Sequence, residues 1–403
     1  MYQVIVMLPV GGPATGEDFI DRKIETKLIL KKLEKDNVIL VAPRRFGKTS
    51  IMLKVKDELE TQGKKAIFLE VENIHTPAEF ITEIIVSLTE IKDKRYKQIV
   101  ISFLEKSGSW IEAHFADIET PVVKATLRGK ILSELNEDWQ SIAKKIISTL
   151  HDTDEIFYFV VDEFPIAIQN MKTVDTSEAK QFLQWFRKLR TISRNVKFLV
   201  GGSVSIDNIV REAGGITLIN DFDRVKINGF EKNVALSVSK QIIGKKYRPE
   251  IGEKILECIG EPYIPYFLMI TLSQINDEHE LHGDKITKDL VEIVYNNKIL
   301  GSQGRHYFQH YSDRLAERCN YSEMGEKVSR AILGKVSTTN YYDIELAFGV
   351  YKKETGDSDR SKFMDLIANL ENDFYIEFDR KQGLKFYSKM LKDWWRIYHA
   401  SIN

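Results

Sequence analysis

The chain has 403 residues, which is too long for one ordinary hydrophobic core, so two or three domains are expected. Hydrophobic residues make up 43% and charged residues 29% of the chain, as in a soluble globular protein, and no apolar run reaches the ~20 residues that cross a bilayer. The formal net charge of −1 excludes a global electrostatic attraction to nucleic acid or to a membrane surface. The two cysteines, Cys258 and Cys319, lie far apart, which argues against a disulfide framework and favours a cytoplasmic location.

Strands and helices alternate through the first 229 residues. An amphipathic helix over 24–35 precedes an apolar strand at 38–41, and the next helix runs from Lys48 to about Gln62. In chain order, the later elements of this part are a strand at 65–71, a helix at 76–91 capped by Thr76, a helix at 136–150, a strand at 156–164, a helix at 177–192, a strand at 196–203, a helix at 205–214 and a strand at 224–227. This alternation predicts βαβ units, and the fold class is therefore α/β with a mostly parallel sheet.

Few strands are predicted in the rest of the chain. Residues 230–315 show only helical patterns and are expected to form a helical domain that follows the first domain, 1–229. Residues 316–403 follow the order helix, helix, helix, strand, turn, strand, helix, which suggests a winged helix. The segment 95–135 is interpreted as an insertion in the first domain, with a hairpin within 107–130.

A loop with the sequence APRRFGKTS connects the first strand to its helix. It matches the phosphate-binding pattern G-x-x-x-x-G-K-[ST] except that Ala42 replaces the first glycine, and alanine is small enough to begin the same turn. In such a loop Gly47 lets the backbone N–H groups approach the phosphates, Lys48 supplies a cation, and Thr49 offers a hydroxyl ligand to Mg²⁺. A chance Gly-Lys-Thr string is the alternative, but here an apolar strand precedes the loop and an amphipathic helix follows it, as the motif demands. The predicted cofactors are ATP and Mg²⁺, and the predicted loop contacts are Ala42, Pro43, Arg44, Arg45, Phe46, Gly47, Lys48, Thr49 and Ser50.

The second part of this site is predicted at the end of the apolar strand in FVVDEF. Asp162 follows six apolar residues, so its carboxylate is expected where a strand leaves the core, holding a Mg²⁺-bound water beside Thr49. Glu163 can orient or deprotonate the attacking water. The alternative, a solvated Asp-Glu pair in a loop, does not account for the apolar run before it. Ser203, at the end of the strand VKFLVGGS, either contacts the γ-phosphate or caps the next helix, and the sequence leaves both roles open.

Together these segments resemble the AAA+/STAND class of P-loop ATPases, and in particular the archaeal-type ATPase family. The segments that carry the resemblance are FIDR (19–22), APRRFGKTS (42–50), FVVDEF (159–164), FLVGGS (198–203), DFDRVKI (221–227), IGEPYIPYFL (259–268) and FYSKMLKDWW (386–395). The resemblance covers about residues 16–270, and more weakly the C-terminal part. It implies an ATPase core, a helical lid and a winged helix that rearrange in a switch dependent on ATP and Mg²⁺.

The resemblance also implies contacts with the base of the nucleotide. Phe19 and Arg22 would lie near the adenine, and Pro262 or Pro265 would approach the base from the lid. The chain departs from the family pattern in the lid, where Gly260 is followed by glutamate instead of a second glycine. The segment 95–135 has no counterpart in the family pattern.

Three arginines have alternative roles. By family position, Arg224 would precede a short strand and reach the γ-phosphate held by a neighbouring subunit. Its alternative is a structural ion pair with Asp221 or Asp223. Arg44 and Arg45, inside the phosphate loop, either add charge over the phosphates, contact another subunit, or form a solvated tip.

Two further features resemble binding sites but are better explained as structural. His306 and His310 are four residues apart, but they lack the glutamate and the third ligand of a zinc site. Residues 321–403 carry 13 Lys and Arg against 13 Asp and Glu, without the clustered cations that contacts with nucleic-acid phosphates need. The winged helix is therefore predicted to support the ATPase or to contact a protein.

The sequence as a whole predicts a switch ATPase that binds Mg-ATP and hydrolyses it slowly. The catalytic residues predicted are Lys48, Glu163 and Arg224. No nuclease, protease or sensor repeat is recognisable, so the output is expected in self-association or in a separately encoded protein partner. Two alternatives stay open: a DNA-binding regulatory ATPase of replication, transposition or antiviral defence, and an interaction protein that holds ADP.

Overall fold

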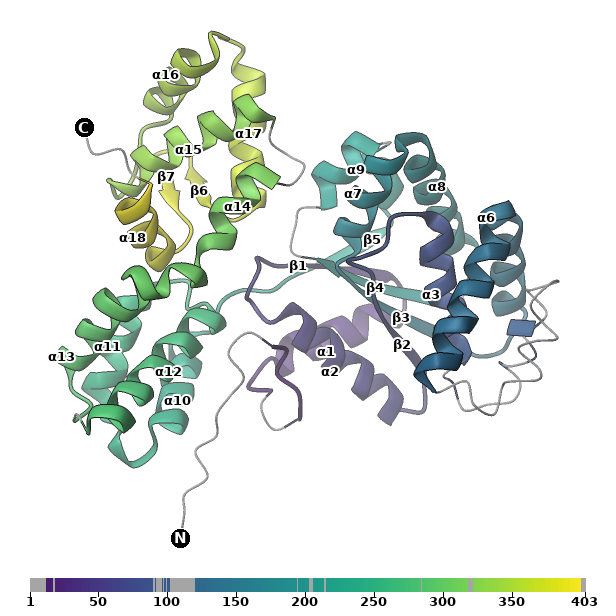
Figure 1. Ribbon diagram of the computed structural model, residues 1–403, viewed down its shortest axis with the longest axis horizontal. Coiled ribbons are helices and arrows are strands. Elements are labelled where there is room, and N and C mark those ends of the chain that lie inside the picture. The colour runs from purple at the N-terminus through teal and green to yellow at the C-terminus, as the bar shows by residue number, and fades with distance from the viewer. Residues whose placement is uncertain are drawn as a thin grey trace. The chain divides into compact units, whose positions relative to one another are not determined.

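The structure is a computed structural model, drawn in Figure 1. It describes residues 12–16, 19–89, 91, 96, 98, 100–101, 120–193, 195–202, 206–213, 215–283, 285–317 and 322–399. The chain divides into two units: a sheet unit of Arg22–Val41 and Lys48–Lys226, and a helical unit of Met1–Asp21, Ala42–Gly47 and Ile227–Asn403. The division after Lys226 lies close to the predicted end of the first domain, and the three-domain organisation stays a prediction.

In its described residues, the sheet unit contains one sheet of five parallel strands in the order β2-β3-β4-β1-β5. The strands are β1 (Asn37–Val41), β2 (Lys65–Glu70), β3 (Phe157–Asp162), β4 (Val196–Gly202) and β5 (Phe222–Lys226). Every residue of β3 is buried, as expected for a parallel strand covered on both faces. The predicted α/β class with a mostly parallel sheet is therefore confirmed.

Helices cover both faces of this sheet, with α1 and α2 on one face and α3 and α6 to α9 on the other (Figure 1). They are α1 (Lys23–Leu33), α2 (Lys48–Thr61), α3 (Pro77–Thr89), α6 (Pro121–His151), α7 (Phe164–Val174), α8 (Thr176–Ile192), α9 (Ile206–Ala213) and the 3-10 helix η3 (Ile216–Ile219). The predicted cap of α3 is confirmed, because Thr76 Oγ1 accepts a hydrogen bond from the Glu79 N–H at 3.2 Å. Glu79 Oε2 in turn accepts from the Thr76 N–H at 3.1 Å, which completes a capping box.

The core of the sheet unit contains a cluster of phenylalanines between α3, α7, α8 and β4. Ring centroids are 4.9 Å apart for Phe80 and Phe182, and 4.7 Å apart for Phe186 and Phe198. All four side chains are fully buried. The cluster therefore holds α3 and α8 against the sheet.

The segment predicted as an insertion is helical where it is described. α6 begins at Pro121, so the described residues of the predicted hairpin form a helix and that prediction is wrong for them. Fully buried apolar residues recur in this helix every four positions: Leu127, Ile131 and Leu135. This spacing places them on one helical face, which explains the helix. The rest of the hairpin segment lies outside the described residues.

Where it is described, the helical unit contains a series of helices and one antiparallel pair of strands. These elements are α10 (Lys232–Ile243), η4 (Gly244–Lys246), α11 (Pro249–Ile259), α12 (Pro265–His282), α13 (Lys288–Ile293), the π-helical turn η5 (Val294–Ile299), η6 (Ser302–Tyr307), α14 (Gln309–Glu317), α15 (Glu323–Ser337), α16 (Ile344–Thr355), α17 (Arg360–Asn372), β6 (Ile376–Asp379), β7 (Gly383–Phe386) and α18 (Lys389–Tyr398). The order from α15 to α18 is the predicted one, while the winged-helix assignment stays a prediction. Within the described part of the chain, no helix is both long and apolar enough to cross a membrane.

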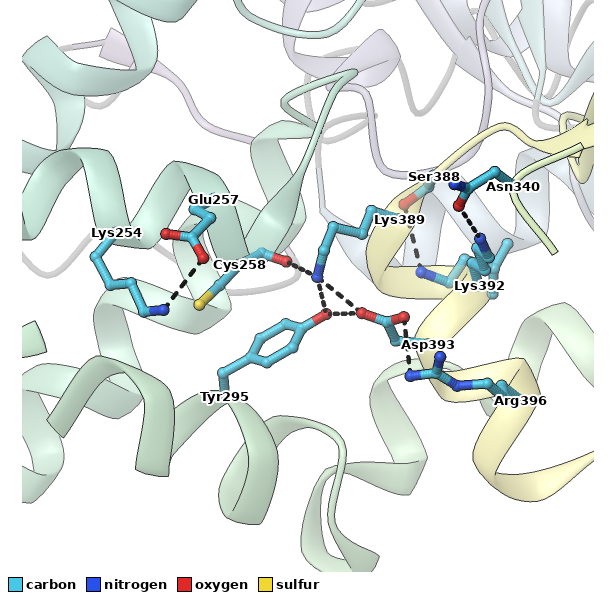
Figure 2. A network of polar contacts seen from close by, with 11 residues as sticks. Lys254, Glu257, Cys258, Tyr295, Asn340, Ser388, Lys389, Lys392, Asp393 and Arg396 are labelled. Carbon is cyan, nitrogen blue, oxygen red and sulfur yellow. Dashed lines mark hydrogen bonds and ion pairs between the residues drawn. The ribbon is translucent and has the colours of Figure 1, made fainter. Parts of the chain in front are cut away.

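Figure 2 shows a polar network inside the helical unit. Lys389 Nζ, on α18, donates to the carbonyl oxygen of Cys258 at 3.2 Å, to the hydroxyl of Tyr295 at 3.3 Å and to Asp393 Oδ2 at 2.8 Å. The Tyr295 hydroxyl donates to the same carboxylate oxygen at 2.8 Å. A Cβ on Gly260 would lie 2.5 Å from the Lys389 Cβ, so glycine allows the lysine stem to pass. The network therefore joins α18 to the end of α11 and to the π-helical turn.

Candidate nucleotide-binding site

The predicted phosphate loop leads from the end of β1 directly into a helix N-terminus. β1 ends at Val41 and α2 begins at Lys48, so the loop lies at the positive end of the helix dipole. Arg45 and Gly47 have positive φ angles of 73° and 80°, and left-handed residues of this kind help to form the concave N–H nest that binds anions. A Cβ at Gly47 would meet no atom within 4 Å, so the backbone conformation, and not space, favours glycine. Ala42 is 4% exposed, which fits the requirement for a small residue.

The acidic pair predicted from FVVDEF lies beside the helix that follows the loop. Thr49 Oγ1 donates to Asp162 Oδ2 at 2.5 Å, and the backbone N–H of Glu163 donates to Asp162 Oδ1 at 2.9 Å. Asp162 is 4% exposed and Lys48 is 6% exposed. β1 and β3 both flank β4 in a parallel sheet, so their carboxyl ends share one edge, where open α/β sheets bind ligands. The structure thus brings together Lys48, Thr49 and the acidic pair.

The surroundings of Asp162 suit a divalent cation. Burial raises the pKa of its carboxyl and the nearby Glu163 raises it further, while the hydrogen bond from Thr49 and the charge of Lys48 lower that pKa. A bound cation would stabilise the ionised carboxylate, and a hydroxyl with a carboxylate is the hard-oxygen set that Mg²⁺ prefers. The described residues contain no group of three or more His, Cys, Asp or Glu able to hold a metal.

Glu163 stands at a sharp turn between β3 and α7. Its backbone is left-handed, with φ 56° and ψ 29°, which is uncommon for a residue with a side chain. Its carbonyl oxygen accepts hydrogen bonds from the N–H groups of Ile166 at 3.0 Å and Ala167 at 3.2 Å, so the turn is tied to the first turn of α7. Strained backbone of this kind is often found at functional sites.

Two glycines beside this turn were missed as functional candidates. Gly201 and Gly202 end β4, the strand between β1 and β3. A Cβ on Gly201 would lie 3.8 Å from Asp162 Oδ1, and one on Gly202 would lie 3.6 Å from Glu163 Oε2. The available signal was a pair of glycines at the end of a mostly apolar strand, since glycine in a strand often marks a close approach of another segment.

Two residues of the phosphate loop contact rings of the helical unit, to which residues 42–47 belong. The guanidinium carbon of Arg45 lies 4.4 Å from the ring centroid of Tyr266. The Phe46 ring, 1% exposed, lies 6.2 Å from the Tyr387 ring, centroid to centroid. A solvated tip is therefore wrong for Arg45, because an aromatic face attracts the guanidinium. Arg44 is partly buried.

Arg224 lies within β5, so the position before a strand that the family resemblance implied is wrong, and the strand begins two residues earlier than the predicted 224. Its guanidinium pairs with Asp207 of α9, with Nη1–Oδ2 at 2.8 Å and Nη2–Oδ1 at 2.6 Å. The predicted pairing with Asp221 or Asp223 is also wrong. Successive side chains of a strand point to opposite faces, and Asp223 pairs with Lys32 of α1 on the other face. Asp221 comes before the strand, and pairs with an arginine of α8.

The residues predicted near the adenine lie in separate elements. Arg22 is 5% exposed, precedes α1 with a left-handed backbone, and pairs with Glu25 at 2.8 Å. Phe19 is partly buried. Pro265 begins α12, and Pro262 lies in the turn before that helix. Their contacts with a base stay predictions, and Ser203 lies outside the described residues.

No family model and no curated protein matches this chain. Among solved structures, it is similar to the Walker-type ATPase of Pyrococcus abyssi, with 16% identity, a TM-score of 0.58, and coverage of 97% of this chain and 99% of that chain. It is also similar to the ORC2 protein of Aeropyrum pernix in its ADPNP–ADP complexes, with 12% identity, a TM-score of 0.54, and coverage of 92% of each chain. At such identities the likeness concerns the fold. The chain therefore has the fold of a P-loop ATPase of the AAA+ class, with a mostly parallel sheet followed by a helical part.

Proposed function

We propose that this chain binds ATP with Mg²⁺ and hydrolyses it slowly as a molecular switch. The observation that carries the proposal is the 2.5 Å hydrogen bond between Thr49 Oγ1 and Asp162 Oδ2, which joins residues 113 positions apart. Thr49 is the last residue of the phosphate-binding pattern after β1, and Asp162 ends β3, a parallel strand separated from β1 by β4. Hydroxyl and carboxylate converge in this way in P-loop ATPases, where they hold Mg²⁺.

Each member of this cluster has a role in the proposed hydrolysis. The loop N–H groups and the Lys48 ammonium bind the β- and γ-phosphates. Thr49 would hold Mg²⁺ and Asp162 a Mg²⁺-bound water, and the ion neutralises charge that develops on the phosphates. Glu163 orients the attacking water and accepts its proton.

Adenine is the proposed base. Support comes from two proteins of similar fold, one a Walker-type ATPase and the other solved in ADPNP–ADP complexes. Phe19 and Arg22 on one side, and Pro262 or Pro265 on the other, are the proposed contacts with the base. Replacing Phe19 by alanine tests this choice, since it should weaken ATP binding more than binding of inorganic triphosphate.

The switch acts through the phosphate loop. Residues 42–47 pack with the helical unit through the pairs Arg45–Tyr266 and Phe46–Tyr387, both described above. Phosphates that draw the loop N–H groups toward themselves change the backbone that carries these two side chains. The nucleotide state is thereby transmitted to the helical lid and to the winged helix, the two domains proposed for 230–315 and 316–403.

We further propose that the nucleotide state controls self-association of the chain or its binding to a separate protein partner. Arg224 is partly exposed and pairs with Asp207 at the surface, so its guanidinium can exchange this carboxylate for a phosphate of a second copy. The test mixes Glu163→Gln, which binds without hydrolysis, with Arg224→Ala. Recovery of turnover on mixing supports an arginine supplied in trans; no recovery, with a monomer in ATP by light scattering, leaves a monomeric switch.

Binding of DNA by the proposed winged helix is not favoured. The turn between β6 and β7 carries Arg380 and Lys381, whereas the third basic residue, Lys385, lies on β7 and pairs with Glu377 of β6 at 2.6 Å. A gel shift in the nanomolar range at physiological salt, lost on neutralising Arg380, Lys381 and Lys385, would replace the proposal with the DNA-binding alternative.

A direct test of the proposed function measures phosphate release from ATP by the purified chain, with Mg²⁺ and with EDTA. Turnover that needs Mg²⁺, and that is lost in Glu163→Gln while binding of a non-hydrolysable ATP analogue is retained, supports the proposal. Analogue binding without any turnover in the wild-type chain would favour the ADP-holding interaction protein. Absence of binding would contradict both.

A further inference from the structure

The end of β4 lies directly beside the acidic pair. β3 and β4 are neighbours in parallel register, with Val161 opposite Val200, so the turn after β3 continues next to Gly201 and Gly202. Successive residues of a strand point to opposite faces of the sheet. Side chains at 201 and 202 would therefore meet different neighbours.

A side chain at position 202 would collide with the turn that carries Glu163. A Cβ on Gly202 would overlap the Cδ of Pro165, lie 2.7 Å from its Cγ, and lie 3.6 Å from Glu163 Oε2. Contacts of this kind with ring atoms below 3.0 Å are essentially never seen, so some part of the structure must shift.

The turn has little freedom to absorb that shift locally. The proline ring is rigid and stands in the first turn of α7. The next residue toward the site, Phe164, is fully buried, with its ring centroid 4.9 Å from that of Phe186. Displacing Pro165 therefore moves the start of α7, and with it the left-handed backbone of Glu163.

Gly201, one residue earlier, provides a matched contrast. A Cβ there would lie 2.7 Å from Met52 Sδ and 3.3 Å from its Cε. These atoms are the far end of a flexible side chain, which can rotate away at small cost. The same substitution on the same strand thus meets a soft neighbour at 201 and a rigid one at 202.

We propose that Gly202 is a positioning residue for hydrolysis: because it has no side chain, Pro165 and Glu163 lie against the end of β4, and this contact holds the Glu163 carboxylate in place. Gly202 acts through Glu163 and does not itself react. The inference rests on the proposed function, in which Glu163 acts on the attacking water.

The experiment compares single-turnover hydrolysis by the full chain with its affinity for a non-hydrolysable ATP analogue. Gly202→Ala should lower the rate by about 10²-fold, the typical cost of misplacing a reacting group by about 1 Å, with analogue affinity changed by less than about threefold. Gly201→Ala should lower the rate by less than about fivefold.

Rescue is the measurement that separates positioning from general damage. Pro165→Ala removes Cγ and Cδ, so Gly202→Ala combined with Pro165→Ala should regain most of the wild-type rate. In a Glu163→Gln background, Gly202→Ala should change the residual rate by less than about twofold, because the group it positions is already gone.

The outcomes separate this inference from the proposed function. Wild-type turnover with an undiminished Gly202→Ala rate, or a loss that Pro165→Ala does not restore, would overturn the positioning role alone. A wild-type chain without Mg²⁺-dependent turnover would remove the proposed function and this inference with it.

Discussion

Two regions of this molecule assemble the same three functional groups to different effect. At the edge of the sheet, Lys48 and Thr49 stand beside the carboxylate of Asp162. In the helical unit, Lys389 and Tyr295 stand beside the carboxylate of Asp393 (Figure 2). Each region combines an ammonium, a hydroxyl and an aspartate, which is buried at Asp162 and partly buried at Asp393, yet only the first region is proposed to bind a ligand.

The two regions differ in how far neighbouring donors and cations balance the negative charge of the carboxylate. One oxygen of Asp393 accepts hydrogen bonds from both Lys389 and Tyr295, and the lysine also bonds a carbonyl oxygen. Burial and this aspartate raise the pKa of the Tyr295 hydroxyl, which therefore stays a neutral donor. Around Asp162 the opposing effects still leave its pKa raised, so its charge is not fully compensated.

Backbone geometry also distinguishes the structural network around Asp393 from the proposed ligand site around Asp162. Lys389 and Asp393 are four residues apart on one helix, a spacing at which side chains meet without help from the rest of the fold. Lys48 follows a loop with two positive φ angles and begins a helix whose dipole favours anions. Similar side chains therefore satisfy one another in the Asp393 network, whereas around Asp162 the backbone geometry favours binding of a charged ligand.

The largest expected effect comes from removing the two lysines in turn. Lys48→Ala should lower the affinity for ATP by at least about 10²-fold, because the direct cation on the phosphates is lost. Lys389→Ala should leave ATP affinity within about twofold and lower stability instead. Isothermal titration with ATP, with circular dichroism to verify folding, makes the comparison. Equal affinities for Lys48→Ala and the wild type would contradict the phosphate-loop assignment.

The next effect concerns the stability of the helical unit. Asp393→Ala leaves a tyrosine hydroxyl and a lysine without their shared acceptor, and should cost about 1.5–3 kcal/mol. Denaturant unfolding measures this loss. Arg396→Ala, which removes an exposed partner at 3.4 Å from the same aspartate, is the control and should cost less than about 0.5 kcal/mol. Equal losses in the two variants would mean that the network contributes nothing beyond an ordinary surface pair.

The sequence predicts the first region far better than the second. The strand, the Gly47-Lys48-Thr49 string and the helix lie within one short stretch, so periodicity and motif act together. Asp162 could be predicted because six apolar residues mark the end of its strand. Local sequence patterns were sufficient to predict the phosphate loop and Asp162, because each of these patterns lies within a single segment of the chain.

Contacts between distant segments could not be predicted in this way. Arg224 pairs with Asp207, 17 residues away and on another element, whereas the sequence offered two nearer aspartates. Lys389 bonds the carbonyl of Cys258 across 131 positions. The clash that a side chain at 202 would cause depends on a proline after a different strand. Such contacts are set by packing of the sheet and helices, which no local pattern encodes.

A smaller effect is expected in the pH dependence of folding stability, which tests whether the negative charge of Asp162 is only partly balanced by its neighbours. Its folded-state pKa lies above the unfolded value, so the folded chain binds the proton more tightly, and stability falls as pH rises through the window between the two values. Asp162→Asn removes this loss and should make the nucleotide-free chain about 1 kcal/mol more stable at pH 8. Its advantage should shrink as pH is lowered toward 4, and Mg²⁺ dependence should be lost. Denaturant unfolding at several pH values measures both trends, and a variant less stable than the wild type at pH 8 would contradict the comparison.

The smallest expected effect uses the exposed pair Arg224–Asp207 as a reference for both regions. Its geometry is bidentate, but the arginine side chain is 42% exposed and the aspartate 25% exposed, so water and salt screen the charges. A double-mutant cycle of Arg224→Ala and Asp207→Ala should give a coupling free energy of about 0.2–1 kcal/mol, which falls further in 1 M salt. In the pair Lys389–Asp393 the lysine side chain is 43% exposed, but the carboxylate is 14% exposed and also accepts a hydrogen bond from Tyr295. The same cycle on this pair should therefore give a larger coupling that depends less on salt. Similar couplings for the two pairs would mean that burial does not distinguish the closed network from a surface contact, and the contrast with the Asp162 site would then rest on backbone geometry alone.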